Sequence, residues 1–267
     1  MRFLLSAALS ALLIPSAFPQ EPSEQQIEQI IAKFAAKEAE FARARENYTY
    51  RQTVRIQEMD PGGNPGGKFE VVSDIIFSAE GKRTERVVRA PVPTLRNITM
   101  TPEDEQDLRN VQPFVLTTKE LPNYLIRYLG KQTLDEIPCF TFAVKPKKME
   151  PGQRYFSGIV WVDDRDLQIV KTYGRGTGVT KKGFDNQFPK FETYREQIDG
   201  KFWFPTYTAA DTILPFEAGP QRITLMVRYQ DYKQFGSDIK ITFGDEVAGS
   251  GQAAPAEPKP ATPAKKP

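Results

Sequence analysis

The chain has 267 residues, with 36 Lys and Arg against 34 Asp and Glu, which gives a formal net charge of +2 at pH 7. Hydrophobic residues make up 39% of it and aromatic residues 11%, a composition typical of a globular protein and not of a disordered one. This balance, without a dense basic run, argues against nucleic acid as a partner. The length suits one large β-domain or two small ones.

Histidine is absent from the whole sequence, and Cys139 is its one cysteine. Histidine is the usual general base near neutral pH and a common metal ligand, so neither a Ser-His-Asp nor a Cys-His catalytic unit can be built from this chain. A single cysteine also excludes a disulfide within the chain. We therefore predict a protein that is not an enzyme and that has no cofactor and no metal site.

The first twenty residues resemble a secretory signal peptide. Arg2 supplies a short positive region, and residues 3–14 form an apolar run that is too short to span a bilayer well. We expect cleavage between about residues 16 and 20 and a periplasmic mature protein. An uncleaved anchor or a short buried helix is the alternative. No cysteine follows the apolar run, so we expect no lipoprotein anchor, and no later run predicts a transmembrane helix.

One amphipathic helix is expected directly after the signal. Ser23 is its predicted N-cap, with Gln26 three residues on as the partner in a capping box, and the helix should end near residues 45–47. Its apolar face is formed at helical spacing by Ile27, Ile30, Ile31, Phe34 and Phe41. Its polar face is assigned to Lys33, Lys37, Glu38 and Glu40.

From Tyr48 onward the hydrophobic period changes to two, which indicates half-buried strands. The first strands are expected at residues 48–56, 69–77 and 83–89, joined by turns at 60–67 and 80–82. Thr101 then predicts the start of a short helix, because a proline and acidic residues follow it.

A second series of strands is predicted after this helix. These strands are expected at residues 124–133, 139–145, 155–162, 167–173, 188–197, 202–213 and 222–235, with a last short one near 240–243 and a glycine-rich break at 174–182. Short hairpin connections favour a mainly β (α+β) fold, a single curled antiparallel sheet covered by the N-terminal helix and the Thr101 helix. The predicted domains are a signal peptide at 1–20, a β-domain at 21–244 and a disordered Ala/Pro/Lys-rich tail at 245–267.

The stretch from about residue 128 to 235 resembles a known family. The residues that carry the resemblance are Tyr128-Leu-Gly130, Asp135, Cys139-Phe140, Val144 to Lys148, Tyr155 to Asp163 with its G-x-x-W-V-D element, Leu167-Gln-Ile-Val-Lys171, Phe191 to Arg195 and Trp203-Phe-Pro205. They are similar to the LolA-like outer-membrane lipoprotein-sorting proteins of bacteria. The resemblance implies a half-open antiparallel barrel with a helical lid over an apolar cavity.

Two motifs are candidate chemical sites. Ser237 to Lys240 matches S-x-x-K, but an alternating strand pattern would place its Ser and Lys on opposite faces. Gly174-Arg-Gly-Thr-Gly178 resembles a phosphate cradle, but no apolar helix follows, so a mobile loop is favoured. An alternative is that Arg175, Lys181 and Lys182 meet anionic headgroups at the barrel mouth.

Two groups of carboxylates are further candidates for a chemical site. Asp163, Asp164 and Asp166 could offer oxygens to Ca²⁺, but a polar hairpin turn is favoured because the spacing of a calcium loop is missing. Glu192 and Glu196 are formal candidates for a catalytic carboxylate pair. The sequence does not assign them that role, because the test is their separation in space, which it cannot give.

A one-layer curled sheet leaves more apolar concave surface than one helix can fill, and a lipid would occupy the excess. The predicted cavity residues are Tyr50, Val54, Ile56, Phe69, Val71, Phe77, Phe140, Phe142, Val160, Val162 and Trp203. Ordinary core packing is the alternative for each of them. Cys139 is expected to be a small buried hydrophobe.

The first functional hypothesis is a carrier or chaperone-like protein that binds a lipid or the acyl chain of a lipid-modified protein. The second is an envelope sensor or interaction module that uses the same fold to bind a protein partner. An enzyme is the least favoured of the three.

Overall fold

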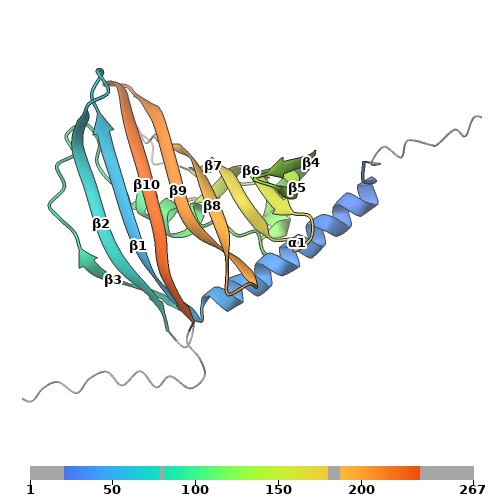
Figure 1. The fold of residues 1–267 in the computed structure, drawn as a ribbon. Coiled ribbons are helices and arrows are strands. Elements are labelled where there is room, and N and C mark those ends of the chain that lie inside the picture. Colours follow the sequence, from blue (N-terminus) through green and yellow to red (C-terminus); the bar gives the residue numbers. More distant parts are fainter. Residues whose placement is uncertain (1–20, 79–80, 180–186, 235–267) are drawn as a thin grey trace, which may run out of the picture. The chain divides into compact units, whose positions relative to one another are not determined.

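The computed structural model describes residues 21–78, 81–179 and 187–234 (Figure 1). Its strands in chain order are β1 (Tyr48–Met59), β2 (Pro65–Phe77), β3 (Arg83–Arg89), β4 (Tyr124–Leu134), β5 (Ile137–Pro146), β6 (Tyr155–Asp163), β7 (Ile169–Thr177), β8 (Lys190–Ile198), β9 (Phe202–Phe216) and β10 (Gly219–Gln234). They form one sheet in the order β3-β2-β1-β10-β9-β8-β7-β6-β5-β4, and every pair is antiparallel.

The sheet consists of two meanders joined at one seam. Strands β1 to β3 form the first and β4 to β10 the second, and the pairing of β1 with β10, from Tyr48 opposite Gln234 to Met59 opposite Arg222, connects them. Strands β3 and β4 are the two edges within the described part of the chain, so the sheet curls without closing. The predicted fold class, mainly β with a single curled antiparallel sheet, is confirmed.

The N-terminal helix α1 (Glu24–Arg45) begins as its sequence predicts. The Gln26 backbone N–H donates to Oγ of Ser23 at 3.3 Å, and the Ser23 N–H donates to Oε1 of Gln26 at 2.8 Å, which completes a capping box. Figure 1 shows α1 running across one end of the strands, and Phe34 and Ala35 of this helix are fully buried.

The predicted polar face of α1 is wrong at Glu38, which is fully buried. Glu38 follows Phe34 by four positions and precedes Phe41 by three, so it lies in the same stripe as the apolar residues. Its carboxylate accepts hydrogen bonds there from Nη1 of Arg195 at 3.1 Å and from the Ile169 backbone N–H at 3.0 Å.

The predicted glycine-rich break from residue 174 is wrong in its first part, because β7 continues to Thr177. Gly174 lies opposite Gly158 of β6, and a Cβ on Gly174 would lie 2.8 Å from the ring of Phe156. At Gly176 an added Cβ would collide with the carboxylate of Asp107. These glycines therefore make room, within a strand, for side chains that come from elsewhere in the fold.

The segment between β3 and β4 covers the concave face of the sheet. It contains α2 (Pro102–Gln106), a single π-helical turn η1 (Asp107–Val111) and a 3₁₀ turn η2 (Leu121–Asn123). Thr101 caps α2 as predicted, since its hydroxyl accepts from the Asp104 N–H and Asp104 accepts from the Thr101 N–H. We call residues 101–116 the lid.

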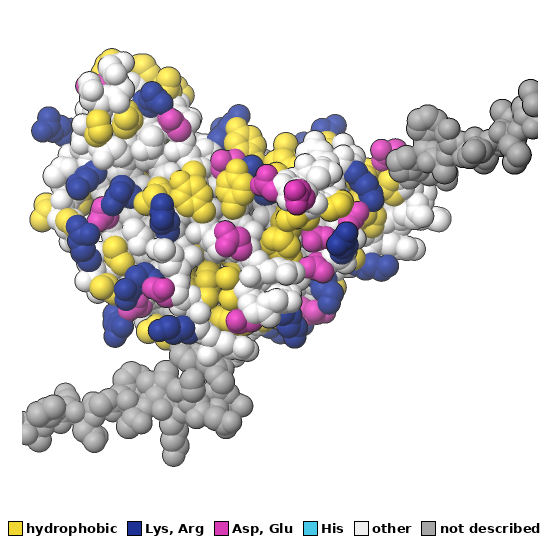
Figure 2. Space-filling view, viewed as in Figure 1, with side chains coloured by type: hydrophobic (Ala, Val, Ile, Leu, Met, Phe, Trp, Pro, Cys, Tyr) yellow, Lys and Arg dark blue, Asp and Glu magenta, His cyan; other side chains and the backbone are white. Residues whose placement is uncertain are grey.

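Figure 2 shows charged and hydrophobic side chains interspersed over this face of the molecule. Among the described helices none is long and apolar enough to cross a membrane. Several predictions fall outside the described residues: the signal peptide at 1–20, the strand at 240–243, the S-x-x-K motif, the tail at 245–267, and Lys181 and Lys182.

Candidate functional site

Three polar attachments hold the lid to the sheet. Arg154, which directly precedes β6, donates through Nε to Oδ1 of Asp107 at 2.8 Å and through Nη2 to Oδ2 at 2.6 Å. Thr193 of β8 donates to the backbone oxygen of Gln112 at 3.0 Å, and Arg195 donates to the backbone oxygen of Phe114. Because Arg195 also binds Glu38, it connects the lid to α1.

Asp107 is strongly perturbed by its surroundings. Burial raises the pKa of its carboxyl to about 6, against the lowering effect of Arg154, and the carboxylates of Asp104 and Glu103 raise it further. The Asp107 side chain is only 9% exposed. Its ion pair with Arg154 thus compensates only part of the cost of removing the charge from water.

The lid also carries apolar side chains into the centre of the concave face. These are Leu108, Val111, Phe114 and Leu116, all buried in the main core cluster. The ring of Phe114 stacks on that of Phe156 with 4.5 Å between centroids and an interplanar angle of 22°. The lid therefore fills with its own side chains much of the space that a half-open barrel would otherwise leave empty.

A small cavity of about 60 Å³ remains between the lid and strands β1, β9 and β10. It is lined by Ile56, Ile98, Thr99, Met100, Asp104, Asp107, Leu108, Gln112, Gln187, Pro189, Phe191, Leu214, Phe216, Ile223 and Leu225. Pockets for organic ligands are typically several hundred Å³. In this conformation the cavity is therefore too small for an acyl chain.

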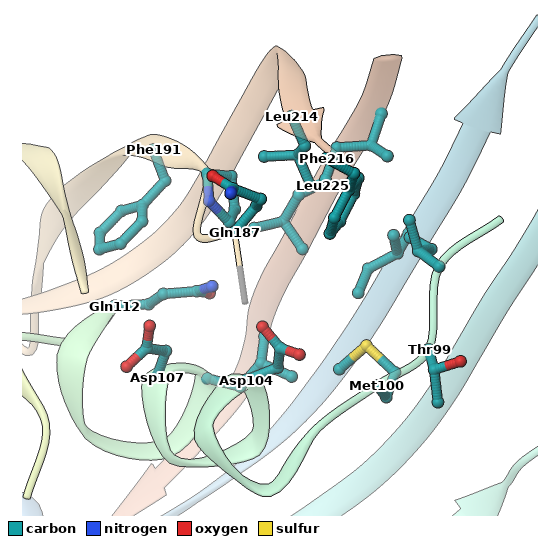
Figure 3. A pocket seen from close by; sticks show the side chains of 15 residues that line it. Thr99, Met100, Asp104, Asp107, Gln112, Gln187, Phe191, Leu214, Phe216 and Leu225 are labelled. Atoms are coloured by element: carbon teal, nitrogen blue, oxygen red, sulfur yellow. The ribbon is translucent and has the colours of Figure 1, made fainter. Parts of the chain in front are cut away.

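The cavity has an apolar wall and a polar wall. In Figure 3 the side chains of Asp104, Asp107 and Gln112 extend from the lid towards Gln187, while Leu214, Phe216 and Leu225 form the opposite side. Gln112 is only 3% exposed, and its Oε1 has no hydrogen-bond partner among the described residues.

The structure brings most of the predicted cavity residues together, but mainly as core. Val54, Ile56, Phe140, Phe142, Val160 and Val162 are buried in the main cluster, and Tyr50, Phe69 and Val71 pack against it. Of all these, Ile56 alone is among the described residues that line the cavity. That they contact a ligand stays a prediction.

Two of the predicted cavity residues lie apart from this cluster. Phe77 is half-buried at the end of β2, opposite Arg83. Trp203 alternates with the buried Phe202 and Phe204 and so faces the other side of the sheet, where its Nε1 donates to Asp166 at 3.2 Å.

The lid contributes site residues that the sequence pattern had not assigned to the site, although the pattern predicted a helix there. The pattern contained a usable signal, because Leu108 and Val111 continue an apolar face beyond the capping box at Thr101. Nothing in the sequence pattern indicated the partner of Asp107, because Arg154 lies 47 positions away and contacts it only in the folded chain.

The remaining residues that the sequence analysis considered have structural roles. Oδ1 of Asp163 accepts the Arg165 N–H at 2.7 Å, which makes the segment a hairpin turn, as favoured. Glu192 pairs with Lys171 at 2.9 Å. Cys139 is fully buried as expected, and burial raises the pKa of its thiol to about 11. Among the described residues no cluster of His, Cys, Asp and Glu could hold a metal.

No protein-family model and no curated protein matches the sequence. Solved structures similar to this chain include a DUF1329 family protein from Desulfovibrio piger, with 14% identity over 77% of this chain and 94% of that one and a TM-score of 0.39. A LolA superfamily protein from Nitrosomonas europaea has 13% identity over 77% and 94%, with a TM-score of 0.37.

A putative outer membrane lipoprotein-sorting protein domain from Vibrio parahaemolyticus has 11% identity over 78% of this chain and 95% of that one, with a TM-score of 0.35. The similar structures thus include members of the LolA-like family that the sequence resembles.

Proposed function

We propose that the protein is an exported bacterial carrier or chaperone-like protein that binds a lipid, or the acyl chain of a lipid-modified protein, beneath the lid. Its site of action would be the periplasm, in keeping with the signal peptide that the sequence predicts. The proposed role needs no enzymatic step and no cofactor, because burial of the acyl chain supplies the driving force, about 0.8 kcal/mol per CH₂ group.

The observation that carries the proposal is the way in which the lid occupies the concave face. Four apolar side chains of the lid are buried there, so their displacement would expose a continuous apolar surface that an acyl chain can cover in exchange. Since the present cavity is about 60 Å³, binding requires the lid to move.

The lid contains several features that weaken its closed position. It includes a π-helical turn, and such turns are rare and occur often at functional sites. The carboxylate of Asp107 is buried at a cost, and two buried atoms, Oε1 of Gln112 and Nη1 of Arg154, have no partner among the described residues. Each unsatisfied buried group costs about 1–3 kcal/mol, which lowers the free energy needed to open the lid.

Binding of a fluorescent acyl probe tests the proposal, together with native mass spectrometry of protein purified from a bacterial envelope. Leu214 and Ile213 are neighbours on β9, but Leu214 is 5% exposed and lines the cavity, whereas Ile213 is 62% exposed. We expect Leu214→Trp to weaken probe binding at least tenfold and Ile213→Trp to leave it unchanged. Absence of both co-purifying lipid and probe binding in the wild type would reject the proposal.

An envelope sensor or protein-interaction module is the second candidate. It is favoured by edge strand β3 and the segment after it, where Val87, Val88 and Val92 are 57%, 50% and 87% exposed. Exposed apolar side chains of this kind can form a contact with a partner protein. A pull-down that yields one stoichiometric protein, lost in Val88→Lys, and no lipid would support this candidate over the carrier.

A further inference from the structure

We infer that the cavity beneath the lid receives a head group that donates hydrogen bonds, such as a hydroxyl or an amine, and that it discriminates against anionic head groups. This inference rests on the proposed function, since it concerns the polar end of the amphiphile whose chain would lie under the lid. It follows from the polar groups that the lid presents to the cavity, and it requires the head group to stay in contact with these lid residues when the lid moves to admit the chain.

Gln112 is the first of these groups. Its side chain is almost completely buried, it lines the cavity, and its Oε1 accepts no hydrogen bond from the described residues (Figure 3). A buried acceptor of this kind is costly and is normally satisfied. A hydroxyl or ammonium group in the cavity would satisfy this oxygen, whereas a carboxylate or phosphate, which has no hydrogen to donate, would leave it unsatisfied.

The charges around the cavity act in the same direction. Asp104 and Asp107 line it, and none of its described lining residues is Lys or Arg. Both oxygens of Asp107 are bound by Arg154, whereas Asp104 accepts, among the described residues, only from Thr101 and interacts with Arg154 only through space. An anionic head group would therefore meet a like charge at low dielectric, and a cationic or neutral donor would not.

Arg154 is the cation bound to Asp107, and its position limits what it can offer. Its guanidinium is engaged twice by Asp107 and lies over the ring of Phe188, 3.8 Å from the centroid, and its Nη1 is buried without a partner among the described residues. It is not among the described residues that line the cavity. The cation thus neutralises Asp107 and leaves Asp104 and Gln112 to set the preference for the head group.

The test compares three probes that share one hydrocarbon chain, namely the alkanol, the alkylamine and the alkanoate, each used below its aggregation concentration at pH 8. Their dissociation constants are measured by competition against a fluorescent acyl probe. We expect the alkanol and the alkylamine to bind the wild type about tenfold more tightly than the alkanoate, a difference of about 1.4 kcal/mol.

Two variants assign this preference to residues. Gln112→Leu removes the acceptor and should reduce the advantage of the alkanol over the alkanoate to less than about threefold, while it raises the melting temperature because an unsatisfied buried group is lost. Asp104→Asn should reduce the advantage of the alkylamine. The matched control is Thr141→Val in β5, since Oγ1 of Thr141 is also buried and unpartnered but lies away from the cavity lining.

The control should raise the melting temperature and keep the wild-type preference. Equal binding of the three probes, or tightest binding of the alkanoate, overturns the inference and leaves the proposed function standing. A preference that survives in Gln112→Leu and Asp104→Asn also overturns it. A wild type that binds none of the probes rejects the proposed function, and the inference with it.

Discussion

Asp107 lies between the guanidinium of Arg154 and the Cα of Gly176, in a place that solvent hardly reaches. Its pKa is about 6 in the folded protein, whereas the ordinary value is 3.8. Between these two pH values the folded protein holds a proton that the unfolded chain releases. The stabilising contribution of this group is therefore fully present below pH 4 and is lost as the pH rises through about 6.

Asp107→Asn should remove this pH dependence. As the pH rises from 4 to 7, we expect the free energy of unfolding of the wild type to fall by about 2–3 kcal/mol relative to that of the variant, the value of a shift of roughly two pKa units. Urea unfolding at a series of pH values measures it. The control is Glu105→Gln, an exposed carboxylate two positions earlier. Parallel profiles for the wild type and Asp107→Asn would contradict the assigned pKa.

Gly176 determines how close the lid can approach β7. Gly176→Ala would force its new methyl group into the carboxylate of Asp107 and should destabilise the protein by about 1–3 kcal/mol. In an Asp107→Ala background the same change should cost much less, because the colliding group is gone, and urea unfolding of the four proteins measures this coupling. Gly66→Ala, where an added Cβ meets ordinary contacts from 3.4 Å, is the control. Additive costs would show that the two residues do not touch.

Helix α1, strand β8 and the lid meet at one ion pair. Glu38 and Arg195 have side chains that are 0% and 1% exposed, and burial raises the pKa of Glu38 above its ordinary value in spite of Arg195. Glu38→Leu should cost about 3–5 kcal/mol, because it leaves Arg195 buried without its partner. The control on the same helix is Glu40→Leu, whose side chain is 46% exposed and pairs only with Lys37.

The double variant Glu38→Leu/Arg195→Leu should regain most of that loss. A residual cost of about 2 kcal/mol is expected from the backbone groups of Ile169 and Phe114, which lose their partners. Thermal and urea unfolding of the single and double variants provide the measurement. If the two single costs simply add, the pair does not act as one unit.

The elements themselves were largely predictable, because their signals are local. The capping box at Ser23, the helix start at Thr101 and the range of β3 agree with the sequence pattern. The errors arise where a distant group changes the meaning of a residue. From sequence alone Gly174 and Gly176 indicate a break, but in the fold they leave room for Phe156 and Asp107. From sequence alone Glu38 is assigned to the polar face, but in the fold it is buried against Arg195.

At the scale of the whole molecule, the seam between β1 and β10 decides where the site lies. It joins residues 163 to 186 positions apart and brings Ile56 of β1 beside Leu225 of β10, two of the strands that line the cavity. Alternation along each strand shows which residues share a face, but not which strand lies next to which. The predicted cavity residues were therefore mostly core residues of the correct face, whereas those around the cavity come from strands and a lid that local pattern cannot bring together.

If the protein binds a lipid as proposed, the same arrangement makes the lid the part of the fold that must respond to it. An acyl chain can enter only if Leu108, Val111 and Phe114 leave the concave face, because they fill it in the closed conformation. Amide hydrogen exchange should therefore quicken in residues 101–116 when an acyl probe is bound, while the paired strands β1 and β10 keep their protection. In Leu214→Trp the probe should have little effect at the same concentration. Slower exchange in the lid on binding would mean that the ligand fits beneath a closed lid, which a cavity of about 60 Å³ does not allow.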